Sequence, residues 1–265
     1  MPRSNSPSAW FRAAIPASLC LLLIGCAAPP AEQDREGGPG TSATWAGRPM
    51  GAPPAPNPGL KRRIVERAEG EWEYFGRQTV VHRGEEESIP HVGYWEDEDA
   101  LRSGRVNSYW RAAGKPGLDG MDCQRPWSAA FMSWVMQSSG VPSIQFARTT
   151  AHWIYLARMI DAAPLPGRYF VPRRIVDYSP EPGDLICASR KPSRVFSIHG
   201  YATARSLYGV SAHCDLVVGK EGRTLESIGG NVRNSVSKSR LELDAQGHLK
   251  PTKRRPWFVI MQNRL

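Results

Sequence analysis

Apolar residues recur with a helical period over residues 126–140. Pro126 suits the first position of a helix, and Gly140 supplies a stop signal at the other end. Such a helix is buried along one face, and its N-terminus carries unpaired N–H groups and a partial positive charge. The apolar positions, spaced at i, i+3, i+4, i+7 and i+8, are Trp127, Ala130, Phe131, Trp134 and Val135.

Three further segments show apolar residues three or four positions apart. The pattern predicts helices over Leu60–Phe75, Leu101–Trp110 and Thr149–Ile160. Between the first two, the acidic stretch Gly84–Asp99 has no regular pattern and is expected to be a loop.

Beyond Pro166 the pattern changes from helical to strand-like. Helices followed by a run of antiparallel strands are typical of an α+β domain. The strands expected from apolar runs and turn residues are Leu185–Ala188, His213–Val218, Thr224–Ile228, part of Val232–Leu243, and Trp257–Met261.

The N-terminus has the pattern of an export signal. Arg3 and Arg12 precede the apolar run Ala13–Ile24, which is short for a membrane span. The run leads to Gly25 and Cys26 and resembles the lipobox of bacterial lipoproteins, which implies a cleaved signal at 1–25 and lipidation of Cys26. An ordinary signal peptide is the alternative. The residue after Cys26 is Ala27 rather than the aspartate that is associated with retention at the inner membrane, so the periplasmic side of the outer membrane is expected.

The rest of the chain divides into two parts. Residues 26–59, rich in Pro, Gly and Ala, are expected to form a disordered tether, and residues 60–265 a single folded domain. Export permits disulfides. Three cysteines lie in the expected domain, so at least one stays free or pairs outside the chain, and any of three pairings is open: the cysteines are Cys123, Cys187 and Cys214.

The net charge of +9 suits an anionic partner such as phospholipid headgroups or a cell-wall polymer. The Lys and Arg residues are spread along the chain without a nucleic-acid-binding motif, so no nucleic acid is expected as a partner. The sequence has no metal-ligand spacing of the Cys-x-x-Cys or His-Glu-x-x-His kind and no phosphate-binding glycine loop. Neither a metal nor another cofactor is predicted.

Three polar residues follow one another in the order used by papain-like enzymes. Ser128 lies at the start of a predicted helix, His213 opens a strand, and Asn231 follows two glycines. In this layout the helix residue is the nucleophile, the histidine takes its proton, and the third residue orients the imidazole. The sequence therefore predicts a catalytic site made of Ser128, His213 and Asn231.

A family resemblance supports the same interpretation. Pro126-Trp127-Ser128-Ala129-Ala130-Phe131 resembles the Trp-Cys-Ala-Ala-Phe-Val motif of CHAP and NlpC-type amidohydrolases, and Gly229-Gly230-Asn231 resembles their Gly-Gly-Asn segment. With Pro182-Gly183-Asp184 and His213-Cys214-Asp215, the set is similar to the bacterial family called domain of unknown function 2272. The resemblance implies a papain-like domain, with N-terminal helices packed on an antiparallel sheet.

The sequence departs from this motif at the nucleophile, where Ser128 replaces a cysteine. A hydroxyl is far less acidic than a thiol, whose pKa is about 8.5, so Ser128 needs a base to remove its proton. Cys123, five residues earlier, is the alternative nucleophile, unless it forms a disulfide or packs as a small apolar residue. The alternative for Ser128 is a helix cap.

The remaining candidates have structural alternatives too. His213 could be a structural histidine bonded to Asp215, and Asn231 a turn residue. Trp127, His152 and Asp215 are candidate binding residues. The sequence thus predicts a lipid-anchored hydrolase that acts on amide bonds of peptidoglycan. A catalytically silent cell-wall-binding domain and a structural envelope lipoprotein are the alternatives.

Overall fold

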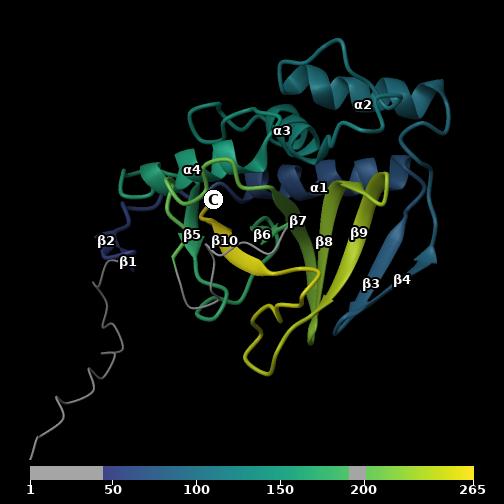
Figure 1. Ribbon diagram of the computed structural model, residues 1–265. Coiled ribbons are helices and arrows are strands. Elements are labelled where there is room, and N and C mark those ends of the chain that lie inside the picture. The colour runs from purple at the N-terminus through teal and green to yellow at the C-terminus, as the bar shows by residue number, and fades with distance from the viewer. Residues whose placement is uncertain (1–43, 191–200) are drawn as a thin grey trace, which may run out of the picture. The chain divides into compact units, whose positions relative to one another are not determined.

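The computed structural model describes residues 44–190 and 201–265, which form an α+β domain (Figure 1). The predicted signal and lipidation site lie outside this range. The helices are α1 (Pro58–Tyr74), α2 (Ala100–Ala112), α3 (Ser128–Ser138) and α4 (His152–Ala162). The strands are β1 (Thr44–Trp45), β2 (Arg48–Pro49), β3 (Thr79–Arg83), β4 (Glu86–His91), β5 (Phe170–Arg173), β6 (Leu185–Ser189), β7 (Ala212–Glu221), β8 (Thr224–Val232), β9 (Ser235–Glu242) and β10 (Trp257–Asn263).

Each predicted helix is present, and local capping explains where two of them begin. Asn57 caps α1 by accepting a hydrogen bond from the backbone N–H of Leu60, and Asp99 caps α2 through the N–H of Arg102. Helix α3 begins at Ser128, slightly later than Pro126, with Trp127 at the N-cap position. No side chain caps this helix, so the Ser128 hydroxyl is available for other contacts.

The main sheet has eight strands in the order β4-β3-β9-β8-β7-β6-β10-β5. Neighbouring strands are antiparallel except β3 and β9, which are parallel. The strands predicted in the C-terminal half are all present, and β6 to β9 lie side by side in sequence order. The α+β class predicted from the sequence is confirmed.

The helices pack against one face of the sheet, as Figure 1 shows. Helices α1 and α3 contact β7 and β8, α4 contacts β5 and β7, and α2 packs on α3. The apolar core lies between these layers. A smaller apolar cluster covers the opposite face and includes Ile186, Val217, Leu225 and Ile260. No helix of the described residues is long and apolar enough to cross a bilayer.

The structure differs from the sequence prediction in three respects. Strands β3 and β5 are additional to the predicted strands. The expected loop Gly84–Asp99 contains β4, whose residues are mostly exposed, so the apolar alternation that identifies a strand is missing there. The last part of the expected tether contains the β1–β2 pair. Trp45 is 5% exposed and donates its indole N–H to the carbonyl of Ala202, so the folded part begins earlier than residue 60.

Candidate active site

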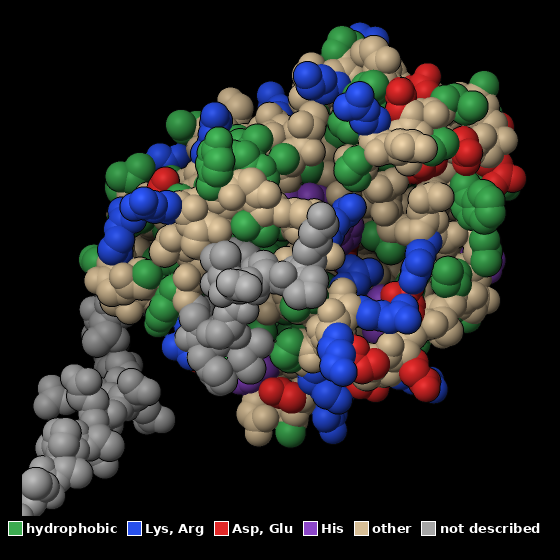
Figure 2. All heavy atoms as spheres, in the orientation of Figure 1, with side chains coloured by type: hydrophobic (Ala, Val, Ile, Leu, Met, Phe, Trp, Pro, Cys, Tyr) green, Lys and Arg blue, Asp and Glu red, His purple; other side chains and the backbone are tan. Residues whose placement is uncertain are grey.

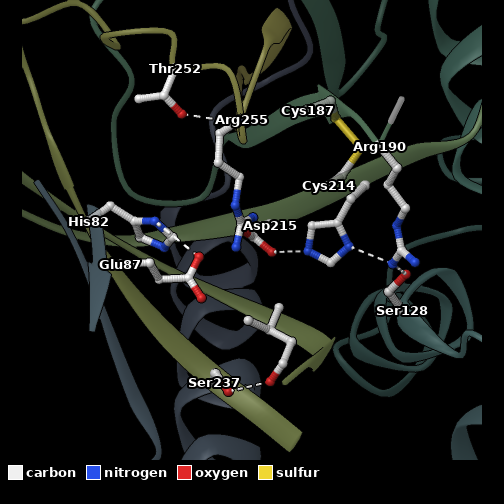
Figure 3. Close-up of polar contacts among 12 residues, drawn as sticks. His82, Glu87, Ser128, Cys187, Arg190, Cys214, Asp215, Ser237, Thr252 and Arg255 are labelled. Atoms are coloured by element: carbon white, nitrogen blue, oxygen red, sulfur yellow. Dashed lines mark hydrogen bonds and ion pairs between the residues drawn. A yellow bond between two sulfur atoms is a disulfide. The ribbon is translucent and has the colours of Figure 1, made fainter. Parts of the chain in front are cut away.

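Ser128 lies at the start of α3, and Figure 3 shows its side chain next to Arg190. Its Oγ is 3.0 Å from Nη2 of Arg190 and 2.7 Å from Nε2 of His152. Because a guanidinium can only donate, Ser128 Oγ accepts from Arg190, whereas the tautomer of His152 decides which atom donates in the bond between Oγ and Nε2. The side chain is almost completely buried, with 3% exposed. Ser128 is therefore bonded to a base rather than used as a helix cap.

His152 is the first residue of α4 and is held from both ring nitrogens. Its Nε2 bonds the hydroxyl of Ser128, and its Nδ1 bonds the hydroxyl of Tyr155, so a single ring hydrogen serves one of these two contacts in the neutral imidazole. Burial lowers the pKa of His152 well below its usual value, and repulsion from His213 and Arg190 lowers it further. The imidazole is therefore neutral at pH 7, the state that can take a proton from Ser128.

His213 lies at the start of β7, and its partner is Asp215 on the same strand. Residues two apart point to the same face of a strand. Nε2 of His213 lies 2.7 Å from Oδ1 of Asp215, and Nδ1 lies 3.1 Å from Nη2 of Arg190. Since Arg190 only donates, Nδ1 carries no hydrogen, and the ring hydrogen is on Nε2, facing the carboxylate. Burial lowers the pKa of His213, although Asp215 opposes the shift.

Asp215 is fully buried but ionised. Burial alone raises the pKa of a carboxyl, but here the attraction and hydrogen bond of His213 and the charge of Arg255 together bring it down to about 2. The Arg255 guanidinium lies 3.4 Å from Oδ2 of Asp215. His213 and Asp215 thus form a carboxylate–imidazole pair with a defined tautomer.

Arg190 connects the two histidine units. One nitrogen, Nη2, donates to both Ser128 and His213, so Ser128 Oγ and His213 Nδ1 are no more than 6.1 Å apart. The rings of His152 and His213 have centroids 5.4 Å apart. Burial lowers the pKa of Arg190, Asp215 raises it, and repulsion from Arg255 lowers it again. Ser128 therefore contacts His152 directly and reaches His213 through Arg190.

Two cavities meet at Arg190. The larger, about 560 Å³, has His213, Asn231 and several cationic residues in its wall. The smaller, about 230 Å³, is lined by Ser128 and His152 together with Trp153 and the 209–212 segment. A ligand that enters the smaller cavity reaches the serine hydroxyl, and one that fills the larger reaches the imidazole of His213.

Asn231 does not orient His213, and Asp215 has that role instead. The Asn231 amide nitrogen donates to Oε2 of Glu96 at 2.8 Å. The indole N–H of Trp127 donates to the same oxygen, and the Trp127 ring is buried against Tyr109, so Trp127 is part of the core rather than a ligand contact. Burial raises the pKa of Glu96, whose Oε1 has no hydrogen-bond partner among the described residues.

The two glycines before Asn231 are explained by close packing. A Cβ on Gly229 would lie 1.9 Å from Oδ1 of Asp215, and a Cβ on Gly230 would lie 2.4 Å from Cβ of Phe131. Strand β8 therefore passes against both the His213–Asp215 pair and helix α3 only because these positions lack side chains. The two glycines of the Gly-Gly-Asn motif therefore serve the close packing of β8 next to the site.

The cysteines divide into one pair and one free thiol in the described part of the chain. Cys187 and Cys214 are opposite each other on β6 and β7 and form a disulfide. Cys123 is exposed and free, with Sγ 3.5 Å from Oδ2 of Asp97, so Cys187–Cys214 is the one formed of the three pairings that the sequence left open. Burial and Asp97 raise its pKa, which disfavours the thiolate that a nucleophile needs.

Three polar residues of this site were not among the sequence candidates. Tyr155 lies three positions after His152, a helical spacing that places the two side chains on one face and would have indicated the pair. Arg190 and Glu96 lie at the end of a strand and in a loop, where no local pattern marks them. Within the described residues, no three His, Cys, Asp or Glu side chains are grouped as metal ligands.

A comparison with known families agrees with the motifs in this site. The model of a family described as an uncharacterized protein conserved in bacteria (DUF2272) matches residues 90–263, more than half of the chain. The chain belongs to the DUF2272 family. The part that matches DUF2272 contains Ser128, His152, Arg190, His213 and Asp215, whereas α1 and β3 precede it. No curated protein matches the chain, and no solved structure does.

Proposed function

We propose that this DUF2272 protein is a cell-envelope hydrolase that cleaves amide bonds by acyl transfer from Ser128. The supporting observation is the 2.7 Å hydrogen bond between the Ser128 hydroxyl and Nε2 of His152, in which the hydroxyl donates when the ring hydrogen is on Nδ1. A hydroxyl that donates to a neutral imidazole is the arrangement that general-base activation of a serine requires. The contact of Arg190 with the same Oγ stabilises negative charge as it develops there.

The chemistry balances with the residues present. Ser128 Oγ forms a bond to the carbonyl carbon of the substrate while its proton passes to Nε2 of His152. The C–N bond then breaks, and that proton goes to the departing amine. Water attacks the acyl group, gives one proton to His152, and releases the acid as the proton returns to Ser128 Oγ.

The His213–Asp215 pair supplies a second base beside the first. Nδ1 of His213 is unprotonated, and Asp215 stabilises the imidazolium that would form on protonation. In the sequence-based interpretation His213 is the base that activates Ser128. In the proposal here His152 takes the first proton, and His213 becomes available to water or substrate once Arg190 is displaced by a ligand.

The fold type, substrate and location in the proposal rest on the sequence motifs. A nucleophile at a helix start, followed by a histidine on a strand, is the papain-like layout. The resemblance to CHAP and NlpC-type amidohydrolases suggests peptidoglycan amide bonds as the substrate. The lipobox-like Cys26 suggests a lipid anchor that holds the domain at the periplasmic side of the outer membrane.

A catalytically silent binding domain is the second candidate function. The observation in its favour is Arg190, which fills the space between Ser128 Oγ and His213 Nδ1 and bonds both. An arginine that permanently occupied this position would prevent a papain-like transfer between the two. In that case the cleft would hold a cell-wall polymer without cleaving it.

Digestion of purified murein tests the proposal. The full chain, purified in detergent so that any anchor is retained, is incubated with murein, and soluble products are identified by mass spectrometry. Wild type is compared with Ser128→Ala, His152→Gln, Cys123→Ala and the matched control Ser108→Ala on α2. Product formation should be lost in Ser128→Ala and fall by about 100-fold or more in His152→Gln, while Ser108→Ala behaves as wild type.

The opposite results are equally clear. Products that persist in Ser128→Ala but vanish in Cys123→Ala would move the nucleophile to the loop before α3. No products from wild type, together with cosedimentation of the protein with murein, would replace the hydrolase with the binding domain.

A further inference from the structure

The larger cavity next to His213 has a strongly cationic wall. Five of its lining residues carry a positive charge, and the one carboxylate among them is Glu87. Figure 2 shows Lys and Arg side chains crowded on the right-hand side of this face, with histidines visible between them. The cationic residues are Arg190, Arg233, Lys253, Arg254 and Arg255.

Internal partners neutralise only part of this charge. Arg233 pairs with Glu87, and Arg255 with Asp215. Arg190 donates to Ser128 and His213, which are both neutral. Lys253 and Arg254 are exposed, and their side chains form no salt bridge within residues 44–190 and 201–265. Three cations therefore face the cavity with side chains that are in no salt bridge among the described residues; the Glu85 carboxylate accepts from the backbone N–H of Lys253.

These cations lie at different points of the wall, which constrains the ligand. Arg190 lies after β6 and borders both cavities, whereas Lys253 and Arg254 lie on the segment before β10. A volume of about 560 Å³ is large enough for a ligand of several residues. A ligand with two or more anionic groups can contact Arg190 and the Lys253–Arg254 segment at once.

The geometry points to this cavity as the subsite for an acidic peptide, whose carboxylates pair with Arg190 and with Lys253 and Arg254. A carboxylate that accepts from Arg190 competes with Ser128 Oγ and His213 Nδ1 for the same nitrogen. Binding of the peptide thereby withdraws Arg190 from between these two residues. As a description of the substrate, the inference rests on the proposed function; as a description of binding, it rests on the charges together with the volume of the cavity, which suits a ligand of several residues.

Binding measured in a variant that cannot cleave tests the binding site separately from the hydrolase activity. Full-length Ser128→Ala protein in detergent is titrated calorimetrically with soluble muropeptides, with the same muropeptides after amidation of their carboxylates, and with tripolyphosphate. The muropeptides should bind, and their affinity should fall strongly as the ionic strength rises to about 1 M, where the screening length is about 3 Å. The amidated muropeptides and tripolyphosphate should bind at least about tenfold more weakly.

Paired charge variants locate the site. Lys253→Gln with Arg254→Gln removes two exposed cations from the cavity, and Arg111→Gln with Lys115→Gln removes two exposed cations at the end of α2. The first pair should weaken muropeptide binding by about tenfold and the second should leave it unchanged, although the net charge is the same.

Equal binding of amidated and unmodified muropeptides, equal effects of the two charge pairs, or tighter binding of tripolyphosphate would overturn the inference. Muropeptide binding in Ser128→Ala, together with the absence of murein cleavage by wild type, would keep the subsite and reject the hydrolase. Cleavage that depends on Ser128 but not on Lys253 and Arg254 would keep the hydrolase and reject the subsite.

Discussion

The hydroxyl oxygen of Ser128 lies 2.7 Å from Nε2 of His152, a residue at the start of the next helix. The helix starts of α3 and α4 thus bring a nucleophile and a base together, while the histidine of β7 is one arginine away. Two neighbouring imidazoles, one bonded to Ser128 directly and one connected to it through Arg190, distinguish this site from a simple serine–histidine–acid row. The predictions below test what holds the site together.

Tyr155→Phe tests the orientation of His152. The change removes the hydrogen-bond partner of Nδ1 and leaves a buried ring nitrogen unpaired, which should lower the free energy of unfolding by about 1–3 kcal/mol. The alternative tautomer, with its hydrogen on Nε2, becomes accessible and cannot accept from Ser128. Murein cleavage should fall by about tenfold or more. Tyr208→Phe, at a tyrosine that is 79% exposed, is the matched control and should change neither quantity.

The lowered pKa of His152 predicts a pH-dependent contribution to stability. Below the unfolded-state value of 6.5 the unfolded chain binds a proton that folded His152 does not, so this contribution is present above pH 6.5 and is lost as pH falls. The contribution of Asp184 to the free energy of unfolding changes with pH in the opposite direction, since burial raises its pKa to about 6. The difference in free energy of unfolding between wild type and His152→Gln isolates the histidine.

Urea unfolding of these two proteins from about pH 8 to about pH 5 measures that difference. Wild type should lose stability relative to His152→Gln as the pH is lowered. A difference that stays constant, or grows in favour of wild type at acidic pH, would show that folded His152 takes up a proton as readily as the unfolded chain does.

Reduction of the Cys187–Cys214 disulfide should destabilise the domain. The bond closes a loop with a sequence separation of 27 residues, so chain entropy predicts a loss of about 3–4 kcal/mol in the free energy of unfolding. Denaturant unfolding with and without reductant measures the loss. Cys123→Ala, which removes the exposed free thiol, should leave the difference between the two conditions unaltered.

Gly230→Ala tests the approach of β8 to α3. The added methyl carbon would lie 2.4 Å from Cβ of Phe131 and 2.7 Å from Cζ3 of Trp127, far inside contact distance. Strand and helix must separate, which should reduce the free energy of unfolding by about 1–3 kcal/mol or more. Gly222→Ala tests only backbone strain, because that glycine has positive φ but open space around it. Equal losses in the two variants would argue against a packing effect at Gly230.

Part of the site was predictable because its residues are related by local geometry. His213 and Asp215 are two positions apart on one strand, so the sequence alone places their side chains on the same face. The predicted helix start near Ser128 is confirmed to within two residues. Strand β4 was missed for the same reason that others were found. Its residues are exposed on an edge, so burial imposes no apolar alternation on them.

The sequence by itself determined the helices and the C-terminal strands, since the apolar spacing of each follows from one element burying one face. It could not determine the partners of the polar residues. Asn231 bonds Glu96, 135 positions away, and Arg190 reaches Ser128 across 62 positions, because the packing of β8, α3 and α4 brings them together. The disulfide was decided in the same way, by the register that places Cys187 opposite Cys214 and leaves Cys123 at the surface.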